Sequence, residues 1–99
     1  MLNINKEVND KKLTISLEGR LDTVTSPMLE SELKSDLDGV EDFVIDMEKL
    51  QYISSAGLRV LLSAMKLMKK QGSMVVRNVN ETIAEIFDVT GFSDILTIE

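Results

Sequence analysis

The sequence contains no cysteine, no histidine and no tryptophan, and it has a single proline. Without cysteine or histidine, a zinc site loses its usual ligands and a serine nucleophile loses its usual base, leaving only carboxylates, lysines or Tyr52 for that role. Three motifs are also missing: the Gly-x-Ser-x-Gly elbow of hydrolases, the phosphate-binding loop of nucleoside triphosphatases and the calcium-binding loop of the EF-hand. We therefore expect that the protein is not an enzyme and holds no metal and no cofactor.

Long apolar runs are missing as well. A membrane-spanning helix needs roughly 20 apolar residues, and no stretch of this sequence approaches that length. Residues 2–8 include asparagine, lysine and glutamate, which does not match the apolar block of a signal peptide. The lack of cysteine fits a reducing compartment. These absences predict a cytoplasmic protein with no membrane partner, and the length predicts one domain over residues 1–99.

The formal net charge is −6 at pH 7, which disfavours nucleic acid as a partner because its phosphates would be repelled. The first 50 residues contain twelve acidic and six basic side chains, whereas the remaining residues contain five of each. In that second part Arg59, Lys66 and Lys70 recur at helical spacing, with Lys69 beside them. This stripe predicts either the solvated face of a helix or a docking surface for an acidic partner.

Alternating apolar and polar residues predict strands, and apolar residues three or four apart predict helices. The expected elements are strands over 2–8 and 13–17, a helix over 26–38, a strand over 43–47 that runs on toward 53, a helix over 55–71, a strand over 74–76, a helix over 81–89 and a short strand over 95–98. This order, β-β-α-β-α-β-α-β, predicts an α/β fold in which helices pack on a mixed β-sheet.

Several local expectations accompany these elements. Ser26 is predicted to cap the first helix, with Pro27 as its first residue, and Asn80 is predicted to cap the last helix. The continuous apolar run 43–45 predicts a strand that is covered on both faces. Three methionines at core spacing are interpreted as core filler and not as an adaptable binding surface: Met65, Met68 and Met74.

The stretch from Tyr52 to Leu62 is the most informative part of the sequence. A strand pattern leads directly into Ser54 and Ser55, and an apolar helix pattern without proline follows. The two hydroxyls are therefore predicted at a helix N-terminus, where backbone N–H groups are free and negative charge is stabilised. From these residues alone, two interpretations stay open: a serine that caps the helix, and a serine that carries a phosphate.

Four segments stand in a characteristic order: Gly19-Arg20-Leu21-Asp22 followed by Thr25, Val44-Ile45-Asp46-Met47, Ser54-Ser55-Ala56-Gly57-Leu58, and Ile86-Phe87-Asp88-Val89-Thr90-Gly91-Phe92. In this order they resemble the motifs of the STAS domain, the family of the bacterial anti-sigma factor antagonists. The third segment resembles the family's Asp-Ser-Ser/Thr/Ala-Gly-Leu motif, which contains a phosphorylatable serine. Ser54 stands where that motif usually has aspartate, which is a departure from the family pattern.

The resemblance implies a single STAS domain that regulates transcription by partner switching. In the family, the unmodified protein binds an anti-sigma factor that is also a serine protein kinase, and the sigma factor is released. Phosphorylation by that kinase ends the binding, and a metal-dependent, PP2C-like serine phosphatase restores it. An alternative is a constitutive STAS scaffold subunit of a multi-protein or transporter-associated assembly, whose serine is never modified. A nucleotide or small-ligand sensor is a third interpretation, which no glycine-rich loop supports.

The resemblance also implies site residues. Ser55 stands at the phosphorylated position, and Ser54 is the alternative acceptor or the helix cap. The other residues predicted to contact the partner are Asp22, Thr25, Asp46, Ala56, Gly57 and Arg59, together with Ser54. For Asp22 and Thr25 a purely local role in a turn is equally open. Asp46 is expected to end the central strand close to Ser55, Gly57 to allow close approach of backbone or partner, and Arg59 to meet an acidic partner or remain solvated.

Overall fold

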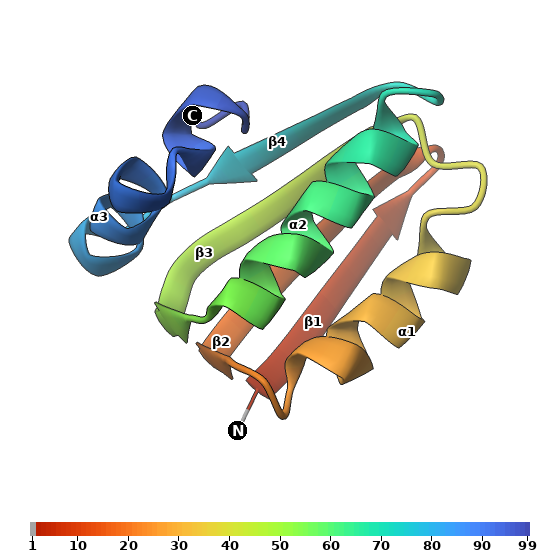
Figure 1. Cartoon of the computed structure of the whole chain (residues 1–99). Coiled ribbons are helices and arrows are strands. Elements are labelled where there is room, and N and C mark those ends of the chain that lie inside the picture. Colours follow the sequence, from red (N-terminus) through yellow and green to blue (C-terminus); the bar gives the residue numbers. More distant parts are fainter. Residues whose placement is uncertain (1) are drawn as a thin grey trace.

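The computed structural model describes residues 2–99, so Met1 of the predicted domain lies outside it. A four-stranded sheet and three α-helices make up the fold (Figure 1). The elements are β1 (Leu2–Asn9), β2 (Lys12–Leu21), α1 (Ser26–Asp36), β3 (Asp42–Ile53), α2 (Ser55–Met68), β4 (Ser73–Arg77), α3 (Glu81–Thr90) and the short 3-10 helix η1 (Phe92–Asp94). Within residues 2–99, no helix is long and apolar enough to cross a membrane. The predicted α/β class is confirmed.

The strands lie in the order β1-β2-β3-β4, so each strand pairs with its neighbour in the sequence. β1 is antiparallel to β2, and β2, β3 and β4 run parallel to one another, which confirms the predicted mixed sheet. The hairpin between β1 and β2 has only Asp10 and Lys11 outside the strands. Asp10 adopts a φ of 57°, the left-handed conformation that glycine supplies in most such turns.

The core lies between the sheet and the helices. Figure 1 shows α1 and α2 together on one face of the sheet. Leu13, Ile15 and Leu17 of β2 and Phe43 and Ile45 of β3 point to that face, and all are buried. Alternation along the strand directs Val44 to the opposite face. The prediction for 43–45 is a strand covered on both faces, and Val44 on this second face is buried as well. It lies in register between residues of the two neighbouring strands, Thr14 and Val75.

The first helix begins differently from the prediction. Thr25 is the N-cap residue, and Ser26 and Pro27 are the first two helical residues. The reason is that the turn before the helix already has helical bonding: the Ser26 N–H donates to the Asp22 carbonyl at 2.9 Å. Ser26 is buried, at 2% exposure, and does not act as a cap. In contrast, the predicted cap of α3 is confirmed, since the Asn80 Oδ1 accepts from the Ile83 N–H at 3.0 Å.

The predicted last strand over 95–98 is replaced by coiled chain and one bridge. The Leu96 N–H donates to the Phe92 carbonyl at 2.8 Å, so the backbone stays coiled through η1 and beyond it. Only the final residues are extended, and within residues 2–99 their pairing with the sheet is limited to the parallel bridge between Val76 and Ile98. Too few residues remain extended to build a fifth strand.

Lys6 links the first strand to α1. Its Nζ lies 2.5 Å from Glu32 Oε1 and 2.6 Å from Asp36 Oδ2. The hydrogen bond to Asp36, followed by that to Glu32, raises the pKa of Lys6 above its ordinary value. Two carboxylates from the acidic first half of the sequence are thereby neutralised within the fold.

Gln71 ties the end of α1 to the end of α2. Its Nε2 donates to the Leu37 carbonyl at 2.9 Å and to the Val40 carbonyl at 2.7 Å. These carbonyls follow the last turn of α1, where no intrahelical donor is available. The Leu37 carbonyl also accepts from the Val40 N–H at 3.1 Å, and the Gln71 amide adds a bond to each carbonyl that holds the chain as it enters β3.

We predict that Gln71→Glu destabilises the fold by about 1–3 kcal/mol, because two donors are replaced by a carboxylate facing two carbonyls. Gln51→Glu makes the same chemical change on an exposed residue of β3 and should leave stability nearly unchanged. Urea denaturation of both variants measures the difference. Equal midpoints for the two variants would show that the Gln71 bridge does not stabilise the fold.

Candidate functional site

The predicted serine segment lies where the carboxyl ends of β2 and β3 meet the start of α2. Leu21 and Ile53, the last residues of the two strands, are paired in parallel register. Immediately after this pair, the Ser54 N–H donates to the Leu21 carbonyl at 2.9 Å. The strand pairing therefore continues into the first residue of the turn, and α2 starts from a fixed point.

Gly19 makes this register possible. It has a φ of 106°, which a residue with a side chain rarely adopts, and the register of β2 against β3 shifts between Gly19 and Arg20. After the shift, Arg20 pairs with Tyr52 and Leu21 with Ile53. The shift at this glycine, together with an earlier one between Ser16 and Glu18, thus sets which side chains stand next to the serines.

The two serines have different roles in the structure. Ser54 is the N-cap of α2, and its Oγ accepts from the Gly57 N–H at 3.3 Å. Its carbonyl also accepts from the Leu58 N–H at 2.9 Å. Ser55 is the first helical residue and is exposed. Within residues 2–99, no hydrogen bond engages the Ser55 hydroxyl, whereas every polar group of Ser54 is engaged. The prediction of Ser54 as the cap is confirmed.

Gly57 is where the helix contacts the strand ends most closely. A Cβ at this position would lie 2.8 Å from Ile53 Cγ1 and 2.9 Å from Leu21 Cγ, too close for either side chain to stay in place. Gly57 is also buried. The sequence predicts that Gly57 allows close approach either of this chain's own backbone or of a partner. The structure shows the close approach within this chain, between α2 and the ends of β2 and β3. Ala56, next to it, is partly exposed on the first turn of α2.

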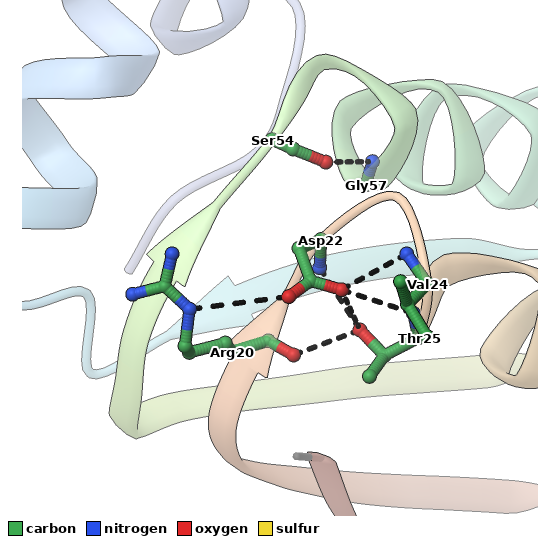
Figure 2. A network of polar contacts seen from close by, with 6 residues as sticks. All are labelled: Arg20, Asp22, Val24, Thr25, Ser54 and Gly57. Atoms are coloured by element: carbon green, nitrogen blue, oxygen red, sulfur yellow. Dashed lines mark hydrogen bonds and ion pairs between the residues drawn. The ribbon is translucent and has the colours of Figure 1, made fainter.

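Asp22 and Thr25 form a closed turn beside the serines (Figure 2). Asp22 Oδ1 accepts from the N–H groups of Val24 and Thr25, both at 3.0 Å. In return, the Thr25 Oγ1 accepts from the Asp22 N–H at 2.9 Å and donates to the Arg20 carbonyl at 2.8 Å. Both residues therefore have the local role in a turn that the sequence left open. The turn projects Val24, 85% exposed, into solvent.

These bonds hold the pKa of Asp22 below its ordinary value of 3.8. The largest cause is the hydrogen bond from the Thr25 N–H. The Thr25 hydroxyl, the Val24 N–H and the charge of Arg20 act in the same direction, against an opposing effect of desolvation. Arg20 Nε lies 3.9 Å from Asp22 Oδ2. The carboxylate form of Asp22 is thus the one that builds the turn.

Arg20 and Tyr52 were not predicted as site residues. The Arg20 guanidinium lies 4.6 Å from the centre of the Tyr52 ring, over its face, and both side chains are at least partly exposed. Such a pair is a cation–π contact, favourable by about 0.5–1 kcal/mol at an exposed position. A period-two alternation places both residues on the side away from the core. Two register shifts, one between Ser16 and Glu18 and one between Gly19 and Arg20, bring them opposite each other, and the sequence gives no signal for these shifts.

Asp46 does not lie at the serine segment. It is in the interior of β3, seven residues before Ile53, which corresponds to about 20 Å of extended chain. Its carboxylate accepts from the Glu48 N–H at 3.0 Å and from the Asn78 side chain at 2.9 Å. The expectation that Asp46 ends the strand close to Ser55 is wrong, because β3 continues past Met47 to Ile53. Arg59 is exposed on α2 and, within residues 2–99, forms no ion pair.

The sequence profile of the STAS domain matches residues 3–99. The chain belongs to the STAS domain family. Among its relatives, the anti-sigma-B factor antagonist of Bacillus subtilis is 32% identical over 100 residues, which cover 98% of this chain and 92% of the relative.

Solved structures share the same STAS fold. An anti-sigma factor antagonist from Mycobacterium paratuberculosis superposes with a TM-score of 0.89 at 22% identity, covering 99% of this chain and 85% of the other. The antagonist SpoIIAA gives TM-scores of 0.85 in its unphosphorylated form and 0.75 in its phosphorylated form, at 18% and 19% identity. Both comparisons cover 98% of this chain, with 88% and 91% of SpoIIAA.

In this STAS domain we predict that Thr25→Val destabilises the fold by about 1–2 kcal/mol, because the hydroxyl makes two hydrogen bonds within the turn. Thr25→Ser keeps the hydroxyl and should recover most of that loss. Urea denaturation measures both variants. If the valine and serine variants unfold at the same midpoint, the hydroxyl contributes nothing and the turn is held by Asp22 alone.

The lowered pKa of Asp22 predicts a pH dependence. The pKa of Asp22 is lower in the folded protein than in the unfolded chain, so between these two pKa values the unfolded chain binds more protons. The stabilisation that the Asp22 carboxylate contributes is therefore fully present above the unfolded pKa. It is lost as the pH falls through the folded pKa. Urea midpoints of the wild type and of Asp22→Asn, measured from about pH 6 to about pH 3, should therefore converge toward the acidic end. A constant difference between the two over this range would contradict the assignment.

Proposed function

We propose that this STAS domain is an anti-sigma factor antagonist whose binding to an anti-sigma factor with serine kinase activity is ended by phosphorylation of Ser55. The observation that supports this most directly is the contrast between the two serines. Ser54 uses its N–H to bond the end of β2 and its hydroxyl and carbonyl to start α2, whereas the Ser55 hydroxyl is exposed and unengaged within residues 2–99. A kinase can therefore reach Ser55 without breaking the cap. The relative from Bacillus subtilis is named as an anti-sigma-B factor antagonist, which supports the partner class.

The fold should tolerate a phosphate at Ser55. At neutral pH the group adds about −1.5 to −2 charges. It would lie at the N-terminus of α2, where the helix dipole and the first N–H groups stabilise negative charge. Arg59, four residues further along the same helix, is exposed on the same side and is close enough in sequence to pair with it. The structural neighbour SpoIIAA exists in both forms with the same fold, which supports this expectation.

In contrast, binding of the partner should not tolerate a phosphate at Ser55. The surface around Ser55 includes exposed apolar side chains on the neighbouring turn and strand end: Val24 and Tyr52. Apolar contacts of this kind require close packing without water, and a charged group inserted there would be buried without a partner. A penalty of about 3 kcal/mol corresponds to more than a hundredfold in affinity. The proposed switch therefore acts on the interface and leaves the fold unchanged.

The proposal extends to the neighbouring residues and partners. The partner would contact Asp22, Thr25 and Ala56, or residues that these three hold in place. Arg59 would face the partner or the phosphate. A PP2C-like phosphatase in the cytoplasm would remove the phosphate and restore the Ser55 hydroxyl. Asp46 is too far along β3 to belong to this surface. The second candidate function, a constitutive scaffold subunit, requires the same fold but predicts that Ser55 has no effect on binding.

The test uses the anti-sigma factors with kinase domains that the source organism encodes, purified and immobilised. We predict that the wild type and Ser55→Ala bind one of them with similar affinity, and that Ser55→Glu binds about a hundredfold more weakly. Ser63→Glu is the matched control, since Ser63 is an exposed serine of the same helix. Incubation with ATP followed by mass spectrometry should place the phosphate on Ser55 and not on Ser54.

Circular dichroism and thermal melting should be the same for the wild type and the phosphorylated protein. Equal binding of all four proteins would contradict the switch and favour the scaffold. A phosphate found on Ser54 would contradict the assignment of Ser55, and melting of the fold on phosphorylation would contradict an interface-only effect.

A further inference from the structure

The outer edge of β4 is only partly paired. The Val76 N–H donates to the Thr97 carbonyl at 2.8 Å, and the Val76 carbonyl accepts from the Glu99 N–H at 2.9 Å. Along a strand, backbone groups of alternate residues point to the same side, so those of Met74 point to this outer edge as well. Within residues 2–99, no segment pairs with the edge at Met74. The open part of the edge is thus the N–H and C=O of one residue, Met74, and an unpaired strand edge is where another extended chain can pair.

A cavity of about 280 Å³ lies directly against this open edge. The end of α2 and the segment over 95–97 form its other walls, and its apolar lining comes from Met65, Met68, Met74, Ile95 and Leu96. The interpretation of the methionines as filler holds for Met68 and Met74, which are 1% and 9% exposed and belong to the core. Met65 is only partly buried and lines the cavity. Flexible methionine side chains adapt to the shape of an inserted apolar group.

Positive charge gathers beside the cavity. Lys69 lines it, and Lys66 and Lys70 lie within one turn on the exposed side of the same helix end. Within residues 2–99, none of the three lysines forms an ion pair. In a protein with a net charge of −6, three unpaired cations next to an apolar cavity complement an acidic partner and would repel a basic one.

We propose that the β4 edge and this cavity form a docking site for an extended acidic peptide segment of a partner protein. The main chain of the segment would pair with Met74, one apolar side chain would fill the cavity, and carboxylates would lie near Lys66, Lys69 and Lys70. The site is at the opposite end of α2 from Ser55, and the 14 residues of that helix span about 21 Å. The two sites therefore lie apart on the surface, and the two proposals stand or fail independently.

The experiment uses the full chain with ¹³C-labelled methionine methyl groups and a set of short synthetic peptides in which glutamate alternates with leucine, isoleucine, valine or phenylalanine. We expect at least one peptide to shift the methyl signals of Met65 and Met74 in NMR titrations. Replacing all three lysines by glutamine (Lys66→Gln, Lys69→Gln, Lys70→Gln) should weaken its binding about tenfold or more. Lys34→Gln removes an exposed cation from α1 and should leave the binding unchanged.

Two matched peptides test the mode of binding. N-methylation of alternate peptide bonds removes the main-chain donors and should abolish binding if the peptide adds to the β4 edge. Replacement of glutamate by lysine should abolish it if charge selects the partner. The proposal is overturned if no acidic peptide shifts these methyl signals at millimolar concentration, if the lysine peptides bind equally well, or if the triple variant binds like the wild type. It is also overturned if sedimentation shows that the chain dimerises and the Met65 and Met74 methyl signals shift with protein concentration, because a second copy would then occupy the edge.

Discussion

The parallel pairing of Leu21 with Ile53 is the contact on which the site depends. Both side chains are buried, and Gly57 packs directly on them, so the first turn of α2 cannot move relative to the ends of β2 and β3. The hydrogen bond from Ser54 to the Leu21 carbonyl fixes the same junction through the backbone. Without the two register shifts between β2 and β3, a different residue of β3 would pair with Leu21, and α2 would start at a different place relative to β2. The serines therefore sit on a rigid support.

This support fits the proposed switch, in which the domain would release a partner without changing its own shape. The cap at Ser54 and the turn at Asp22 and Thr25 each satisfy their own polar groups and use nothing from Ser55. Chemistry at the Ser55 hydroxyl therefore has no internal bond to break. The energetic effect of a phosphate falls on whatever packs against the surface, which is the requirement for the proposed switch.

The two ends of α2 have different physical character. The N-terminal end offers free N–H groups and an exposed hydroxyl, and the C-terminal end offers lysines, methionines and an open strand edge. Between them the helix is a core element, with Leu58, Leu61 and Ala64 buried against the sheet. A single rigid helix thus separates two surfaces of different chemistry, which allows each to be changed without disturbing the other.

The sequence by itself determined the order of the first seven elements, the hairpin, the start of α2 at the serines and the cap at Asn80, because these depend on local periodicity and on single side chains bonding to nearby backbone. It also pointed to the family through short motifs. Tertiary structure decided the rest. The length of β3 moved Asp46 away from Ser55, the coiled chain after Phe92 removed the last strand, and the pairing of Arg20 with Tyr52 followed from a register shift. Each of these depends on contacts between residues far apart in the chain, and local sequence patterns do not encode which strand residue lies opposite which.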